Sequence, residues 1–166
     1  MIVIVMGVAG SGKTTVGRLL AERLACSFFD GDHFHPRENV EKMASGQPLN
    51  DEDRLPWLMR LNGMLRECHD AGKHAVLACS ALKQVYREIL SSGIRDMCFV
   101  HLKGDYQTIY DRMANRTEHY MGARMLQSQF DALEDPADAL VLGILDLPDE
   151  IVAKIETHVQ KKMDAR

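Results

Sequence analysis

The chain has 166 residues, of which 46% are hydrophobic and 27% are charged, and its formal net charge is −4. This length predicts a single domain, residues 1–166, and the acidic balance without a basic run argues against nucleic acid as a partner. No apolar stretch approaches a membrane span and the four cysteines lack a C-x-x-C pair, so we expect a cytoplasmic protein with free thiols and no membrane partner.

A glycine-rich loop follows the first predicted strand, Ile2–Met6. The loop consists of Gly7, Val8, Ala9, Gly10, Ser11, Gly12, Lys13 and Thr14. It fits the pattern G-x-x-x-x-G-K-[ST] at every fixed position. After it, apolar residues are spaced as one face of a helix, at Val16, Leu19, Leu20 and Leu24. Strand, loop and helix in this order predict a site for a nucleoside triphosphate.

The residue types of this loop suit the chemistry of phosphate. Glycines let backbone N–H groups turn toward phosphate oxygens where side chains would collide, and the helix start adds free N–H groups up to Thr15. Lys13 is expected to bridge the β- and γ-phosphates, and the Thr14 hydroxyl to bind Mg²⁺. The alternative is a glycine-rich turn without a ligand, which the complete pattern in its complete context disfavours.

A second strand, 28–32, ends in two acids, Asp30 and Asp32. Pro36 then begins a short helix in which we expect Val40 to face inward. Loop residues 45–50 lead into a longer helix over about 51–69, whose apolar side carries Leu55, Leu58, Leu61 and Leu65. A third strand, 75–79, precedes the helix with the clearest apolar period, at Leu82, Val85, Tyr86, Ile89 and Leu90.

The last part of the chain continues the alternation. A strand over 97–102 precedes a helix from about Asp105, on which Arg112 and Arg116 lie one turn apart. Residues 117–123 lack apolar periodicity and are expected to form a loop. Further elements are a helix with Leu126, Phe130 and Leu133, a strand over 140–145, and a final helix with Ile151, Ile155 and Val159. This order predicts an α/β fold, a parallel sheet covered on both faces with ligands at the carboxyl ends of its strands.

Two classes of nucleotide-binding protein are disfavoured by the sequence. The guanine-reading N-K-x-D element and the D-x-x-G switch of GTPases do not occur, and a motor or large ATPase needs a longer chain. A small-molecule kinase remains, with its second substrate near the ends of the second and third strands.

Several segments resemble the gluconokinase family. They are 29–36, Asn39, 42–43, Gly46, 48–51, 53–54, 56–58, 78–83, 86–87, 127–130 and 133–134. The match runs from the loop to about Pro136, and its combination of motifs is far more specific than the loop alone. One departure is visible, because Thr117-Glu118 stands where the family has a basic residue and a glycine before the lid histidine, here His119.

The resemblance implies a P-loop kinase fold of the shikimate-kinase and nucleoside-kinase type. This is a three-layer α/β/α domain with a five-stranded parallel sheet and a mobile lid over roughly residues 116–124. It implies ATP-dependent phosphorylation of D-gluconate at the terminal hydroxyl, with Mg²⁺, and a homodimer. The alternatives are a kinase of the same fold for another acceptor, such as shikimate or a nucleotide, and a regulator that binds ATP without turnover.

Three residues near the second strand are candidates for the acceptor site. Asp32, at a matching family position, is expected to contact the substrate and accept the proton of its attacking hydroxyl, although a loop cap or an ion-pair partner is the alternative. Asp30 either reaches Mg²⁺ through water or caps the next helix. Arg54 is expected to bind the carboxylate of gluconate, against the usual fate of such a residue in a surface ion pair.

Four more residues complete the predicted site. Lys83, after the third strand, is a candidate for substrate binding or for a solvated helix start. His35 is expected to donate or accept a hydrogen bond from substrate, or to cap locally. Arg112 is expected to bind the nucleotide and Arg116 to act in catalysis, because arginine stacks on adenine and neutralises transferring phosphates; solvated surface charges are the alternative for both.

Overall fold

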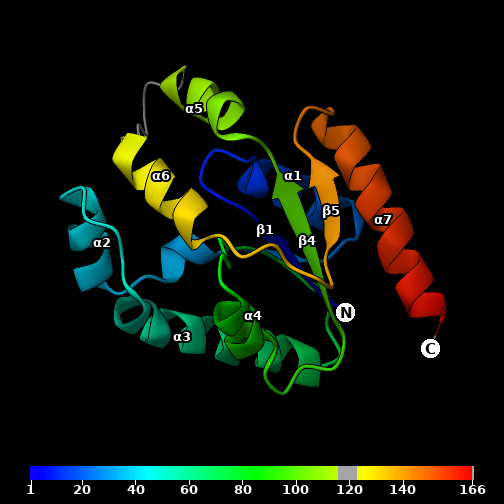
Figure 1. Ribbon diagram of the computed structural model, residues 1–166. Coiled ribbons are helices and arrows are strands. Elements are labelled where there is room, and N and C mark those ends of the chain that lie inside the picture. The colour runs from blue at the N-terminus through cyan, green and yellow to red at the C-terminus, as the bar shows by residue number, and fades with distance from the viewer. Residues whose placement is uncertain (116–122, 166) are drawn as a thin grey trace.

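The computed structural model describes residues 1–115 and 123–165 of the chain (Figure 1). In chain order its elements are β1 (Ile2–Met6), α1 (Lys13–Arg23), β2 (Ser27–Asp30), the 3₁₀ helix η1 (Gly31–Phe34), α2 (Arg37–Ala44), α3 (Asp51–Asp70), β3 (Ala75–Ala78), α4 (Gln84–Ser91), β4 (Met97–Lys103), α5 (Tyr106–Ala114), α6 (Ala123–Ala132), β5 (Leu140–Gly143) and α7 (Pro148–Asp164). Arg116 and most of the segment predicted as a lid lie outside the described residues.

The five strands form one parallel sheet in the order β2-β3-β1-β4-β5, which confirms the predicted α/β fold. β1 lies in the middle, with Val5 opposite Ala78 of β3 and Val100 of β4. All five residues of β1 are buried. A strand covered on both faces needs a continuous apolar run, which is what the sequence provides at this position.

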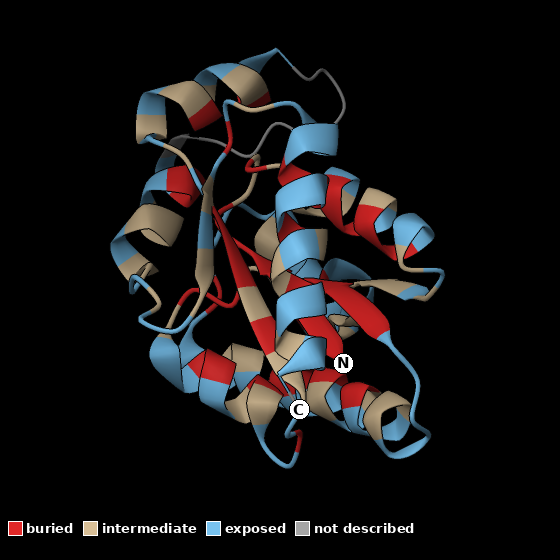
Figure 2. Cartoon of the chain, turned by 90° about the vertical axis from the view of Figure 1, so that its right-hand side faces the viewer, coloured by how far each residue is buried: buried red, intermediate tan, exposed pale blue. Residues whose placement is uncertain are grey.

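The sheet separates two hydrophobic cores. Val3 and Val5 of β1 face a core shared with α1 and α7, whereas Ile2, Ile4 and Met6 face the core of α3 and α4. Figure 1 shows α1 and α7 on one side of the sheet and α3 and α4 on the other. In Figure 2 the buried positions of the helices lie toward the sheet and the exposed positions lie outside. The predicted three layers are therefore present.

Three apolar residues that the periodicity places inward are exposed instead, namely Val40 (49% exposed), Leu55 (45%) and Val85 (47%). In α2 the buried residue is Asn39, because its amide donates to the carbonyl of Asp53. In α3 the buried stripe is centred on Trp57 and Leu58, which turns Leu55 outward. An apolar period thus identifies a helix correctly but also includes apolar residues that the neighbouring elements leave exposed.

The strand ends also differ from the prediction. β2 ends at Asp30 rather than Asp32, and the chain turns at once into η1. β5 ends at Gly143, and Leu145, predicted to be part of it, is largely exposed. No helix within the described ranges is both long and apolar enough to cross a bilayer. The turn after β2 matters most, because it carries the two acids at the carboxyl edge of the sheet.

Candidate active site

The glycine loop joins β1 to α1 and is closely covered by its neighbours. Gly7 has a φ of +145°, and a Cβ there would lie 2.8 Å from the carbonyl oxygen of Leu102. A Cβ on Gly10, which has a φ of +77°, would lie 2.6 Å from Cγ of Met113 on α5. Both positions therefore require glycine for its backbone conformation and its size. The loop is held in a shape that larger residues could not adopt.

The start of α1 leaves hydrogen-bond donors open toward this loop. Gly12 caps the helix in the left-handed conformation, no side chain caps the helix, and its first turn contains no acid. The Ser11 hydroxyl oxygen is buried, and within the described part of the chain it has no hydrogen-bond partner. Free N–H groups and the positive end of a helix dipole bind anions. This geometry fits phosphate oxygens, as the loop motif predicts.

Lys13 folds back over the loop. Its Nζ donates to the carbonyl oxygen of Val8 at 2.8 Å. Burial lowers the pKa of the Lys13 ammonium, while the carboxylates of Asp32 and Asp30 oppose that shift. The ammonium thus lies between the loop and the two acids that follow β2.

Asp30 accepts two hydrogen bonds, one of which is the helix cap considered for it, whereas its contact with Mg²⁺ stays a prediction. One carboxylate oxygen accepts the Thr14 hydroxyl at 2.9 Å, and the other accepts the backbone N–H of Asp32 at 3.1 Å. The first contact orients the threonine of the loop, and the second caps η1. The Asp30 carboxylate and the Thr14 hydroxyl are hard oxygen ligands of the kind that Mg²⁺ prefers. No group of three or more metal-binding side chains occurs among the described residues.

Asp32 lies on η1, exposed, one short turn beyond the strand end where it was predicted. Its position is fixed through the preceding residue. Trp57 Nε1 donates to the carbonyl oxygen of Gly31 at 2.7 Å, and a Cβ on Gly31 would lie 2.9 Å from the carbonyl oxygen of Ala78. Trp57 is buried in the core, and through this hydrogen bond it also anchors the backbone next to Asp32.

His35 lies against the same tryptophan. The two rings stack with centroids 4.1 Å apart and an interplanar angle of 17°, and the Asn39 amide contacts His35 Nδ1 at 3.3 Å. Burial lowers the pKa of His35; Asp32 acts to raise it and Arg54 to lower it. The imidazole is therefore neutral near pH 7 and lies within the electrostatic reach of both residues.

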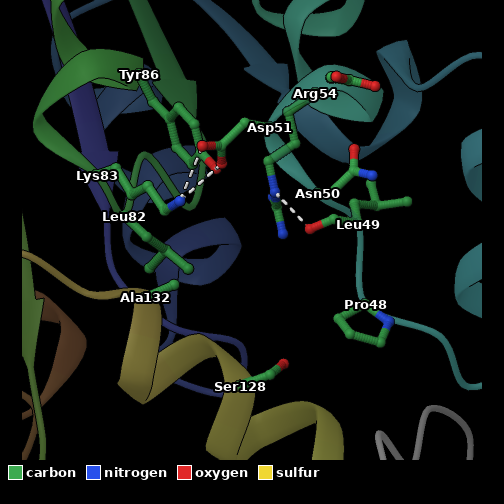
Figure 3. Close-up of a pocket in the computed structure, with 11 residues that line it drawn as sticks. Pro48, Leu49, Asn50, Asp51, Arg54, Leu82, Lys83, Tyr86, Ser128 and Ala132 are labelled. Atoms are coloured by element: carbon green, nitrogen blue, oxygen red, sulfur yellow. Dashed lines mark hydrogen bonds and ion pairs between the residues drawn. The ribbon is translucent and has the colours of Figure 1, made fainter.

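A pocket of about 530 Å³ opens between α3, α4 and α6 (Figure 3). It is lined by Pro48, Leu49, Asn50, Asp51, Glu52, Arg54, Leu82, Lys83, Tyr86, Ser128 and Ala132. Both faces of the pocket carry polar groups, and its volume suits a small polar molecule. Of the predicted acceptor-binding residues, Arg54 and Lys83 line it.

The two cations of this pocket differ in their partners. Lys83 Nζ donates to both carboxylate oxygens of Asp51, at 2.7 and 3.0 Å, and the Tyr86 hydroxyl donates to the same carboxylate. Arg54 donates from Nε to the carbonyl oxygen of Leu49 at 3.3 Å, and its guanidinium lies 5.7 Å from the Tyr86 ring centroid. Within the described residues Arg54 forms no ion pair, and Figure 3 shows it reaching across the cavity.

Loop, acids and pocket converge near the end of β3. Burial raises the pKa of the Cys79 thiol to about 12, and the charges of Asp32, Lys13 and Arg54 all act on it. The buried Cys79 thiol is therefore within electrostatic reach of Lys13, Asp32 and Arg54. These three residues, predicted separately, lie around one point at the carboxyl edge of the sheet.

Of the two arginines predicted to act on the nucleotide, the structure describes Arg112. Arg112, half-buried on α5, donates from Nη2 to the carbonyl oxygen of Ile144 at 2.6 Å. It follows Ile109 and precedes Met113, the residues that cover Gly10. Arg112 therefore lies on the helix whose side chains cover Gly10, and it does not line the pocket of Arg54. Arg116 lies outside the described residues.

Sequence reasoning missed several residues of this site. In the pocket Asp51 pairs with Lys83 and accepts the Tyr86 hydroxyl, and at the loop Gln129 accepts the backbone N–H of Ala9 at 2.7 Å. Asp51 looked like an ordinary acid in the first turn of a helix, and Tyr86 like part of an apolar period. The only sequence signal for Gln129 was the segment 127–130 that it shares with the family motif.

Comparison with known proteins yields consistent likenesses. The model of the shikimate kinase family matches residues 9–159. The gluconokinase of Gluconobacter oxydans is 49% identical over 160 residues, which cover 95% of this chain and 90% of that protein. The thermoresistant gluconokinase of Escherichia coli is 44% identical over 165 residues, covering 97% of this chain and 94% of that one.

Solved structures agree with these relatives. A gluconokinase from Sinorhizobium meliloti superposes with a TM-score of 0.88 at 36% identity, covering 98% of this chain and 93% of that one. A shikimate kinase from Aquifex aeolicus superposes with a TM-score of 0.55 at 17% identity, covering 98% of each chain, which shows a common fold alone.

Proposed function

This chain belongs to the gluconokinase family of P-loop kinases and phosphorylates gluconate with ATP, and we propose how its residues share that work. The transfer joins the γ-phosphate of ATP to the terminal hydroxyl of D-gluconate and leaves ADP and 6-phospho-D-gluconate. The observation that carries the assignment to residues is Arg54, a cation in the acceptor pocket without an ion pair among the described residues. A sugar acid supplies the carboxylate that such a fork binds well.

The nucleotide is held by the loop Gly7–Thr14 and by the free N–H groups at the start of α1, including that of Thr15. The buried Ser11 hydroxyl and the positive φ angles of Gly7 and Gly10 support phosphate at this position. Lys13 exchanges its contact with the Val8 carbonyl for phosphate oxygens. Arg112 is proposed to contact the nucleotide from α5, and Arg116 to stabilise charge during transfer.

Thr14 and Asp30 are the residues that would hold Mg²⁺. Their mutual hydrogen bond of 2.9 Å places a hydroxyl and a carboxylate together beside the loop, a set of hard oxygen donors that this cation prefers. When bound, Mg²⁺ neutralises negative charge on the phosphates. Asp30 also fixes η1 through the Asp32 N–H, so the cation site and the acid share one support.

The acceptor is bound by its carboxylate at Arg54. Lys83 is already paired with Asp51, so Arg54 is the pocket cation that has no ion pair among the described residues and is left for a monoanionic ligand. We propose that Lys83 and His35 hydrogen-bond hydroxyl groups of the sugar chain. His35 suits this role because its neutral ring can donate from one nitrogen while Asn39 contacts the other.

Asp32 receives the proton of the attacking hydroxyl as its oxygen bonds to the γ-phosphorus. Its carboxylate is exposed at the carboxyl edge of the sheet, near Lys13, and its backbone is anchored through Trp57 and Gly31. Anchoring matters because phosphoryl transfer depends on position and charge neutralisation more than on covalent chemistry by the protein.

A panel assay tests the choice of acceptor. Purified protein is given ATP and Mg²⁺ with gluconate, shikimate or a nucleoside monophosphate, and ADP release is followed with each. We expect gluconate to exceed the others in kcat/KM by at least about 10²-fold, since sites that bind a substrate through hydrogen bonds reject analogues that leave them unpaired. Equal or higher turnover with shikimate or a nucleotide would overturn the assignment.

Two further parts of the proposal are a homodimer, which the family resemblance implies, and a cytoplasmic location, which the cysteine pattern and the absence of a long apolar stretch predict. Sedimentation equilibrium of the purified chain tests the first. A mass near twice the 18.7 kDa of one chain supports the dimer, and a monomer at micromolar concentration contradicts it.

A further inference from the structure

Helix α6 contacts both halves of the active site. Gln129 Oε1 accepts the N–H of Ala9 in the glycine loop at 2.7 Å. Its neighbour Ser128 and, one turn later, Ala132 line the acceptor pocket, as Figure 3 shows for both. Helix α6 thus joins the glycine loop, where we propose that ATP binds, to the pocket, where we propose that gluconate binds.

The far end of α6 is fixed to the other wall of the pocket. The backbone N–H of Glu134 donates to the carbonyl oxygen of Leu82 at 2.9 Å, and its carboxylate accepts the N–H of Gln84 at 2.6 Å. Both bonds flank Lys83 at the start of α4. In the middle of α6, Phe130 packs on Tyr106 of α5 with ring centroids 5.5 Å apart. The helix is therefore anchored independently of the loop.

The bond to Ala9 reaches the loop where its backbone has little other support. Ala9 lies between Gly7 and Gly10, both at positive φ, and outside β1 and α1. Within the part of the chain that the structure describes, the Ser11 N–H and Lys13 Nζ both donate to the Val8 carbonyl oxygen, and the Gly7 N–H donates to the carbonyl oxygen of Ser80. Gln129 is a side-chain contact that ties this stretch to an element of the acceptor pocket.

We propose that Gln129 is a positioning residue, which sets the phosphate loop relative to the acceptor pocket and couples the binding of the two substrates. The inference rests on the proposed function and adds a residue to it. Misplacing reacting groups by about 1 Å can cost on the order of 10²-fold in rate, so one backbone contact at the loop can decide alignment. The same contact gives each substrate a route to affect the affinity for the other.

The test replaces Gln129 by Met, which has a similar length and helix propensity but no carbonyl. Gln127→Met is the matched control, because Gln127 is exposed on the same helix and its one hydrogen bond among the described residues is to Asp131, at 2.7 Å. For Gln129→Met we expect kcat to fall about 10- to 100-fold, with the KM values for ATP and gluconate within about threefold of wild type. Gln127→Met should retain wild-type kcat.

Calorimetry supplies a readout that a structural role would not change. The gluconate Kd is measured with and without a non-hydrolysable ATP analogue in each protein. The wild type and Gln127→Met should show the same ratio of the two Kd values, different from one, and in Gln129→Met the ratio should approach one. Gln129→Ala provides a second variant should the methionine fail to fold, with the same expectations.

Two results would overturn the inference. One is a folded Gln129 variant with wild-type kcat and a wild-type Kd ratio. The other is a variant with a lower melting temperature and unchanged kcat, which would make the contact structural. If the wild type itself fails to phosphorylate gluconate, the proposed function fails instead, so the two failures are distinguishable.

Discussion

The carboxylate of Asp51 accepts two hydrogen bonds from the ammonium of Lys83, at 2.7 and 3.0 Å, and a third from the hydroxyl of Tyr86. The hydrogen bonds from Lys83 and Tyr86 hold the pKa of the Asp51 carboxyl below its usual range. Lys83 is therefore paired within the pocket, and we propose that Arg54 is the cation that binds an incoming anion.

The Asp51→Asn variant should change which acids the pocket accepts. Asparagine keeps the size and removes the charge, so Lys83 becomes a second free cation. We expect kcat/KM for a dicarboxylic sugar acid such as glucarate to rise several-fold relative to gluconate. Glu52→Gln, which removes a neighbouring pocket charge not paired with Lys83, is the control. An unchanged ratio of the two acids would show that Asp51 does not set acceptor charge.

The Asp32→Asn variant separates chemistry from binding. The amide cannot accept the hydroxyl proton as a base, so kcat should fall by roughly 10²–10⁴-fold while gluconate still binds. Initial rates and calorimetry on the same protein measure the two effects. The adjacent exposed His33→Gln serves as control and should retain wild-type kcat. Loss of gluconate binding in Asp32→Asn with unchanged kcat at saturation would assign Asp32 to recognition.

The Trp57→Phe variant tests how the base is anchored. Phenylalanine keeps a ring beneath His35 but leaves the Gly31 carbonyl without its buried donor. We expect the free energy of unfolding to fall by about 1–3 kcal/mol, the cost of an unsatisfied buried group. Urea denaturation measures this value. Because Gly31 precedes Asp32, kcat should fall as well; full stability and full activity together would show that the bond is dispensable.

Stability should also depend on pH through His35. Burial lowers its folded-state pKa below the ordinary value of 6.5, so the unfolded chain binds the proton more readily. Its contribution is therefore complete above about pH 6.5 and is lost as the pH falls toward the folded-state pKa. The free energy of unfolding should decrease from pH 7 to pH 5, and His35→Gln should make that decrease smaller. An identical slope in both proteins would contradict this assignment.

The sequence predicts the frame of the fold better than its surfaces. The run Ile2–Met6 and the loop motif identify β1, the glycine loop and α1, because buried strands and phosphate loops tolerate few residue types. The inner faces of α2 and α4 are less well predicted. Val40 and Val85 fit an apolar period, yet tertiary contacts turn them to solvent. An apolar period indicates a helix without specifying which neighbour covers it.

For the site, the sequence identifies the residues expected to contact the substrates, but it misses the residues that hold them in position. Lys13, Thr14 and Asp30 are expected from the loop motif and the strand end, and the structure brings Asp30 and Thr14 into contact. Trp57 and Gln129 act through a backbone carbonyl and a backbone N–H that are distant in sequence. Such contacts leave no pattern in a single chain, since any donor or acceptor of the right reach would serve.

We propose that Arg54 binds the carboxylate of gluconate, and the Arg54→Ala variant removes this contact. A charge-assisted contact contributes about 1.5–3 kcal/mol, so the gluconate KM should rise on the order of 10- to 100-fold. Arg60→Ala is the matched control, because Arg60 lies on the same helix and outside the pocket, over the Phe34 ring.

The decisive measurement is steady-state kinetics of Arg54→Ala with gluconate, with glucose as a neutral acceptor, and with varied ATP. We expect a large rise of the gluconate KM and an ATP KM close to that of the wild type. The KM for glucose, which has no carboxylate, should change less. A raised ATP KM with an unchanged gluconate KM would make Arg54 a phosphate ligand and contradict its assignment to the carboxylate of gluconate.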